Sequence, residues 1–120
     1  MRYFLSILSV FILLGCKNTS EKIEKNSIFY VGTYTEKDSK GIYTYSISKE
    51  GKLKDLGIAA TITNPSFLAK SKDNKTLFAV SEIDENGTGS VHSYEIKKDA
   101  LQFINKQESG GAHPCFIAVN

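Results

Sequence analysis

Two residues that could act on a ligand, Asn64 and His113, each stand directly before one of the chain's two prolines. Histidine titrates near neutral pH, so His113, which follows the pair Gly110-Gly111, is the best candidate for a general base. The two residues lie 49 positions apart, in what we interpret below as equivalent loops of a repeat. We therefore expect both side chains to point to the same end of the fold, with Asn64 in contact with a bound ligand.

A glutamate and a second histidine are the other candidates. Glu82 closes the apolar run LFAVSE, where its carboxylate could orient a base or accept hydrogen bonds from ligand hydroxyls. The alternative is that Glu82 is an ordinary hydrogen-bonding residue at the end of a strand. His92 lies inside the run SVHSYEI, and we expect it to pack in the core rather than to take part in catalysis.

Several common catalytic motifs are absent from the sequence. It contains no HExxH pair, no GxSxG turn, no glycine-rich phosphate loop and no closely spaced cysteine ligands, so we expect neither a metal nor a cofactor. Calcium bound by Asn64 and Glu82 is the weaker alternative, because Ca²⁺ takes six or more oxygen ligands. The only arginine is Arg2, so we expect an arginine clamp for a phosphate or a carbonyl oxygen, and the main catalytic residues, beyond Asn120.

The composition indicates a folded domain without attraction for nucleic acid. Hydrophobic residues make up 41% of the chain and charged residues 23%, which excludes disordered and collagen-like chains. The formal net charge is only +2, which gives no electrostatic footprint for DNA or RNA. Runs of like charge never exceed two residues, so the sequence predicts no polybasic membrane patch.

Residues 1–16, MRYFLSILSVFILLGC, have the pattern of an export signal that ends at Cys16. The apolar stretch from Tyr3 to Leu14 would reach about 18 Å as a helix, which is too short for the roughly 30 Å core of a bilayer. The ending LLGC resembles the bacterial lipobox, in which the cysteine is acylated. We therefore expect Cys16 to carry lipid, residues 17–26 to form a flexible tether, and Cys115 to lack a disulfide partner in this sequence. The expected location is the cell envelope, as an exported bacterial lipoprotein that touches the membrane only through its lipid anchor.

The rest of the chain contains a repeat with a period of 49 residues. This offset aligns Phe29 with Phe78, Pro65 with Pro114 and Phe67 with Phe116, and also Tyr45 with Tyr94 and Ile47 with Ile96. A one-residue slip is needed only between about residues 52 and 62. The repeats, 27–75 and 76–120, each hold four short runs typical of strands. These runs are 27–34, 41–47, 52–60 and 65–71 in the first repeat, and 75–82, 90–96, 100–108 and 114–120 in the second.

Four-stranded repeats of this length are typical of an all-β protein of the β-propeller class. Runs such as Leu77-Phe78-Ala79-Val80 are apolar on both faces, which requires sheets stacked face to face. Propellers need roughly four to eight blades to close, so we expect residues 27–120 to be the start of a protein about three times longer. The first repeat begins with the strand that comes second in the next repeat. Its innermost strand is therefore expected from elsewhere in the longer chain.

The motifs GTYT (32–35), GIYTYSI (41–47), NPSFLA (64–69), LFAVSE (77–82) and SGGAHPCFIAV (109–119) together resemble the start of the seven-bladed propeller lactonases. That resemblance implies a metal-independent enzyme, monomeric at full length, that hydrolyses a small-molecule lactone. The substrate would be 6-phosphogluconolactone or a similar unphosphorylated aldonolactone. Relatives also tend to carry a glutamate at the position of Glu82, and often a histidine where this chain has Phe116. The alternative from a different class is a non-catalytic, envelope-anchored β-propeller that serves as a binding module.

Overall fold

The structure is a computed structural model that describes residues 26–98 and 100–120. The predicted export signal, its lipidation site Cys16 and nearly all of the predicted tether lie outside the described residues. Within the described ranges no helix could cross a membrane.

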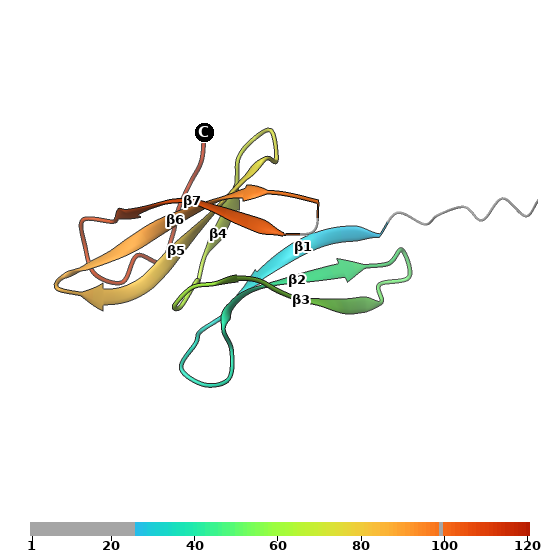
Figure 1. The fold of residues 1–120 in the computed structure, drawn as a ribbon, viewed down its shortest axis with the longest axis horizontal. Helices are drawn as coiled ribbons and strands as arrows, with labels where there is room; N and C mark the ends of the chain where they lie inside the picture. Colours follow the sequence, from blue (N-terminus) through green and yellow to red (C-terminus); the bar gives the residue numbers. More distant parts are fainter. Residues whose placement is uncertain (1–25, 99) are drawn as a thin grey trace, which may run out of the picture.

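The described part of the chain is built from antiparallel strands and contains no helix, as the sequence predicts (Figure 1). The strands form a three-stranded sheet, β1-β2-β3, and a four-stranded sheet, β4-β5-β6-β7. Their bounds are β1 Ser27–Gly32, β2 Gly41–Ile47, β3 Leu53–Thr61, β4 Leu68–Lys70, β5 Thr76–Glu85, β6 Thr88–Ile96 and β7 Leu101–Glu108.

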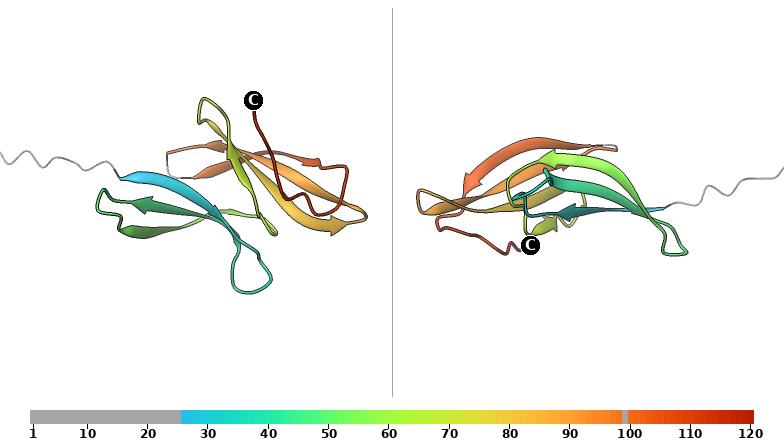
Figure 2. Two further views of the ribbon diagram at one scale, coloured as in Figure 1. Left: turned by 180° about the vertical axis from the view of Figure 1, so that it is seen from behind. Right: turned by 90° about the horizontal axis from the view of Figure 1, so that it is seen from below.

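The two sheets form separate layers with the apolar core between them (Figure 2). Ile42 of the first sheet is fully buried and belongs to one cluster with Leu77, Ala79 and Tyr94 of the second. Partly buried side chains from both sheets, including Tyr30 and Leu68, pack against this cluster. Stacking of this kind covers the face of each sheet that turns toward the other, where Tyr30 of β1 and Leu77 of β5 lie. No further sheet covers the opposite faces within the described residues, and their apolar side chains fit a stack with more blades.

The first sheet lacks a counterpart of β4, which is the short inner strand of the second sheet. This confirms that the first repeat begins with the strand that is second in the next one. The predicted strand over residues 114–120 does not form. A strand is held by its ladder of hydrogen bonds, and β4 pairs with β5, whereas residues 114–120 have no strand beside them in the described part of the chain.

The period of 49 residues holds at the loop that precedes each inner segment. Asn64 and His113 both adopt a left-handed backbone, with φ of 44° and 52°. The rings of the predicted equivalents Phe67 and Phe116 lie next to each other, with centroids 4.9 Å apart. Successive inner segments are therefore neighbours, which is the arrangement expected around a propeller axis.

Between these loops the register of the sheets corrects the predicted alignment by one residue. Gly32 lies opposite Ile42, whereas its counterpart Ser81 lies opposite Ser90, only 48 positions after Ile42. Burial follows the same offset, since the pattern over residues 41–47 recurs over residues 89–95. Tyr45 and Tyr94 therefore do not occupy equivalent positions in the two sheets, and neither do Ile47 and Ile96. The one-residue slip in the alignment begins before residue 52.

The physical reason is the difference between the two connections. A tight turn at Asn86-Gly87, with φ of 56° and 84°, joins β5 to β6, whereas the loop 33–40 joins β1 to β2. Two positive φ values in succession are typical of a hairpin turn that fixes register, and a slip of one residue moves every side chain to the opposite face.

Candidate functional site

Polar side chains from both sheets meet at one end of the two layers, which we call the site end. It is formed by the loops 33–40, 62–67 and 109–113, by the end of β5 from Glu82 onward and by the turn 86–87. The hydroxyl of Tyr34, just after β1, donates a hydrogen bond of 2.9 Å to Oε2 of Glu82 in β5. The backbone N–H of Glu82 donates to the carbonyl oxygen of Asn64 at 3.0 Å. Tyr34, Asn64 and Glu82, which come from three separate segments of the chain, are thus joined into one polar cluster.

Asn64, in the loop between the two sheets, forms hydrogen bonds to a segment of each sheet's site-end region. Its Oδ1 accepts hydrogen bonds from the backbone N–H of Thr35 at 2.9 Å and from the Thr35 hydroxyl at 3.1 Å. Its Nδ2 donates to the carbonyl oxygen of Glu82 at 3.5 Å. Asparagine tolerates the left-handed backbone found here better than most residues do. The amide that the sequence predicts as a ligand contact therefore already holds the loops around Glu82 in place.

Glu82 owes its position to an irregularity in β5. The regular pairing of β5 with β6 ends at Ser81 opposite Ser90 and resumes only at Glu85 opposite Thr88. Residues 82–84 therefore face a single residue of β6, which is a bulge. A bulge turns a strand locally and redirects its side chains, and here it begins at the carboxylate that receives the Tyr34 hydroxyl.

The surroundings of Glu82 favour its ionised form. The hydroxyl of Ser66, then that of Tyr34, lowers the pKa of the Glu82 carboxyl. Burial opposes these two effects less strongly, and the charge of nearby His113 adds the smallest lowering. The buried Ser66 hydroxyl has no hydrogen-bond partner among the described residues, so its effect on the carboxylate of Glu82 is electrostatic. Conversely, the hydrogen bond to Glu82 raises the pKa of Tyr34, with partial desolvation adding to the effect. At neutral pH the pair is thus a phenol donating to a carboxylate.

His113 lies beside this cluster on an exposed loop. Its backbone N–H donates to the carbonyl oxygen of Ile83 at 2.9 Å, which fixes the loop next to the bulge of β5. A left-handed backbone is uncommon for histidine, and the residue before a proline is normally extended, so this loop carries strain. Strain of this kind is concentrated at functional sites, so it favours a functional role for His113.

The structure therefore brings three of the predicted site residues, Asn64, Glu82 and His113, to the same end of the fold. His92 lies elsewhere, in the middle of β6, half-buried, with its ring against those of Tyr94 and Phe103. Its Nε2 and the hydroxyl of Ser90 are 3.1 Å apart. His92 is a packing residue in this structure.

Sequence reasoning missed Tyr34 and Ser66. Tyr34 lies within the motif GTYT, but no counterpart in the second repeat marks it as polar, because Ile83 stands 49 positions later. Ser66 follows Pro65 and gives no signal of its own in the sequence. The stacking of the two sheets brings the Tyr34 hydroxyl to the carboxylate of Glu82, and the pairing of the segment before β4 with β5 brings Ser66 near it.

No group of three or more His, Cys, Asp or Glu side chains is placed to hold a metal ion, as far as the described residues go. The polar atoms that do converge are one carboxylate, one amide and hydroxyls. Such groups recognise hydroxyl-bearing ligands by hydrogen bonds.

A three-stranded and a four-stranded antiparallel sheet, stacked on each other and related by a repeat of 49 residues, are typical of successive blades of a β-propeller. Their polar loops gather at one end of the blades. The chain belongs to the lactonase, seven-bladed β-propeller family, whose model matches residues 28–120.

Similar proteins agree with this family and show how much of it is present. The 6-phosphogluconolactonase of Bacillus subtilis is 38% identical over 96 residues, which are 78% of this chain and 27% of that protein. A solved structure from Bacteroides uniformis, named provisionally as a 6-phosphogluconolactonase, superposes with a TM-score of 0.72 at 35% identity, over 79% of this chain and 28% of that one. The periplasmic gluconolactonase of Pseudomonas aeruginosa gives a TM-score of 0.66 at 33% identity, over 74% and 26% of the two chains. The chain thus spans about a quarter of the length of the relatives it matches.

Proposed function

We propose that this chain forms the first blades of a propeller lactonase that hydrolyses a sugar lactone to the open acid. Membership of the lactonase family carries the proposal. The cluster of Tyr34, Asn64 and Glu82 at the site end supports it, because a sugar lactone presents several hydroxyls and needs hydrogen-bonding partners.

Hydrolysis adds water across the ester bond of the ring. A base removes a proton from water as its oxygen bonds to the carbonyl carbon, and the ring C–O bond then breaks with proton transfer to the leaving oxygen. We assign the base to His113, because its exposed loop lies next to the Glu82 carboxylate. Glu82 orients the ligand or the imidazole, and Asn64 contributes to the ligand contacts. A carboxylate has about four acceptor positions, so Tyr34 leaves capacity for ligand hydroxyls.

The described residues supply no arginine for the negative charge that develops on the carbonyl oxygen. Stabilising that charge is usually the largest single contribution to such catalysis. We therefore expect residues 1–120 alone to be inactive, and the remaining blades to complete the site.

For the substrate we propose an unphosphorylated aldonolactone rather than a phosphorylated one. At the site end, the surroundings of Glu82 favour its ionised carboxylate, which would repel a phosphate. The export signal predicted by the sequence also favours a substrate available outside the cytoplasm, and one similar protein is a periplasmic gluconolactonase. We propose the cell envelope as the location, with Cys16 lipidated, which labelling with palmitate and a Cys16→Ser variant would test.

The test is acid release from glucono-δ-lactone and from 6-phosphoglucono-δ-lactone by the full-length protein, followed in a pH-stat and corrected for spontaneous opening. We expect faster opening of the unphosphorylated lactone. Opening of neither lactone above the spontaneous rate, with the lactones still bound, would instead support the non-catalytic binding module.

A further inference from the structure

The end of the two sheets opposite the candidate site is rich in lysine, and we call it the basic end. It is formed by the turns 48–52, 71–75 and 97–100, by the last residue of β4, and by the start of β1. No two of these turns are adjacent in the sequence, so runs of charge along the chain do not reveal the cluster. The lysines that the fold gathers there are Lys49, Lys52, Lys70, Lys72, Lys75, Lys97 and Lys98.

The charge of the site end has the opposite sign. The residues at that end include the acidic Glu36, Asp38, Glu82, Asp84, Glu85 and Glu108 against the basic Lys37, Lys40 and Lys106. At the basic end the carboxylates placed by the structure are those of Glu50, Asp73 and Glu95, and two of them pair with lysines, Asp73 with Lys75 and Glu95 with Lys97. The two blades therefore carry negative charge at the site end of their strands and positive charge at the basic end.

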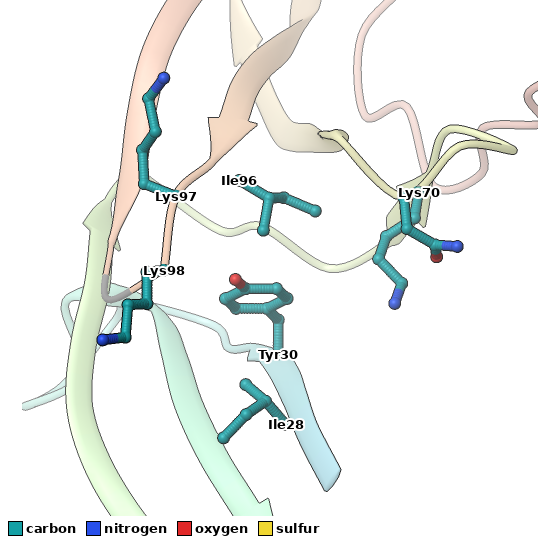
Figure 3. A pocket seen from close by; sticks show the side chains of 7 residues that line it. Ile28, Tyr30, Lys70, Ile96, Lys97 and Lys98 are labelled. Atoms are coloured by element: carbon teal, nitrogen blue, oxygen red, sulfur yellow. The ribbon is translucent and has the colours of Figure 1, made fainter.

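A pocket of about 320 Å³ opens at the basic end between the two sheets (Figure 3). Ile28, Tyr30 and Ile96 form its apolar floor, and the side chains of Lys70, Lys97 and Lys98 stand around it. The rim is thus cationic and the floor apolar, which suits a surface that carries both anionic phosphate groups and hydrocarbon.

The chain enters the fold at this same end. Ile28, which lines the pocket, lies twelve positions after Cys16. Even a fully extended chain from Cys16 to Ser27 reaches at most about 40 Å. This reach exceeds the roughly 34 Å of the ten-residue strand β5, so the tether keeps the protein near the lipid surface without selecting the end that faces it. The charge of the basic end supplies that selection. A single lipid chain holds a protein only weakly, and a basic patch is the usual second contribution.

We propose that the basic end lies against an anionic membrane surface, with Lys70, Lys97 and Lys98 contacting lipid phosphates, so that the site end faces away from the bilayer. The contact adds to the lipid anchor and orients the protein. It does not depend on lactonase activity. Each lysine near an anionic surface strengthens binding about fivefold, so loss of three should weaken it about a hundredfold, and still at least about tenfold if the pairing of Lys97 with Glu95 reduces its share.

The test compares two triple variants of the full-length protein, both in a Cys16→Ser background that removes the predicted acylation site. Lys70→Gln/Lys97→Gln/Lys98→Gln alters the basic end. Lys37→Gln/Lys40→Gln/Lys106→Gln is the matched control, since it removes the same charge and also contains one lysine that is paired with a glutamate, Lys106 with Glu85. Binding is measured by co-sedimentation with vesicles of phosphatidylcholine alone and with vesicles containing phosphatidylglycerol, and thermal melting checks that each variant folds.

We expect the unsubstituted background to prefer the anionic vesicles, the basic-end variant to lose that preference at least about tenfold, and the control to stay within about twofold. Lysine acylation followed by mass spectrometry should show Lys97 and Lys98 protected on anionic vesicles and Lys37 and Lys40 reactive. Equal losses in both variants, no preference for anionic lipid, or abolition of vesicle binding by millimolar inorganic phosphate at constant ionic strength would overturn the proposal. The last result would mean that the pocket takes a free anion instead.

Discussion

Tyr34 and Glu82 belong to different sheets, yet the hydroxyl of Tyr34 donates a 2.9 Å hydrogen bond to Oε2 of Glu82. The contact closes the site end across the interface between two successive blades. Glu82 is therefore held from both sides, by Tyr34 of one unit and by the backbone of Asn64 in the loop between the units. The geometry of this carboxylate depends on the stacking of the blades as much as on β5 itself.

Removing the Tyr34 hydroxyl should raise the pKa of Glu82. Hydrogen bonding and nearby charge place the Glu82 pKa below its ordinary value of 4.5 in the folded protein. The corresponding stabilisation is complete above that value and is lost as the pH falls through the lower folded pKa. In Tyr34→Phe the Glu82 carboxyl should titrate at a higher pH, as measured by NMR of the carboxyl signal, and the stability lost in acid should be smaller because the folded pKa lies closer to the unfolded one. Tyr43→Phe, which loses a hydroxyl bonded to Lys40 instead, is the control and should leave the Glu82 titration unchanged.

Replacement of His113 should separate backbone strain from side-chain function. Because φ is 52° at this residue, glycine fits there without cost, whereas alanine should be about 1 kcal/mol less stable than glycine. Both variants lack the imidazole and should lose the same activity. Chemical denaturation of His113→Gly and His113→Ala in the full-length protein measures the difference, and equal stabilities would show that the loop relaxes to another backbone conformation.

Gly32 should tolerate no side chain. A Cβ at this position would overlap the carbonyl oxygen of Pro65, which is backbone and cannot move without displacing Asn64. Gly32→Ala should therefore lower the free energy of unfolding by about 1–3 kcal/mol and also weaken ligand binding. Gly111→Ala is the matched control, because a Cβ there meets no atom within 4 Å. Similar melting temperatures for the two variants would contradict the packing of Pro65 on β1.

His92 should make stability depend on pH near neutrality. Burial, with a smaller effect of nearby Lys106, lowers the pKa of His92 below its ordinary value of 6.5. The unfolded chain then binds the proton more readily than the folded one, so stability is complete above about pH 6.5 and falls as the pH drops toward the folded pKa. Replacing His92 by Phe should flatten this dependence in melts between pH 5 and pH 8. An unchanged slope would assign it to other groups.

Much of this architecture was predictable because the repeat is visible in residue types. Turn residues and apolar runs predicted the seven strands that form, an eighth over residues 114–120 that does not form, and a first sheet without its innermost strand. The prolines located Asn64 and His113 at equivalent places. The register of β6 was not predictable, because both Ser90 and Val91 are acceptable partners for a buried face until the turn at Asn86-Gly87 selects one. Tyr34 could not be found either, since its partner Glu82 lies on another sheet, and Ser66 lies in a loop whose approach to Glu82 depends on the tertiary fold. The same limit applies to the basic end, whose lysines come from separate turns.

The central claim is that the loops at the site end act on a lactone. Its most direct test is kcat/KM for glucono-δ-lactone in the full-length protein carrying His113→Ala or Glu82→Gln. We predict a fall of about 10² to 10⁴ for His113→Ala, as expected for loss of a general base, and a smaller fall for Glu82→Gln, with both proteins melting as the unsubstituted one does. Unchanged kcat/KM in both variants would contradict the claim and place the catalytic groups entirely outside the described loops.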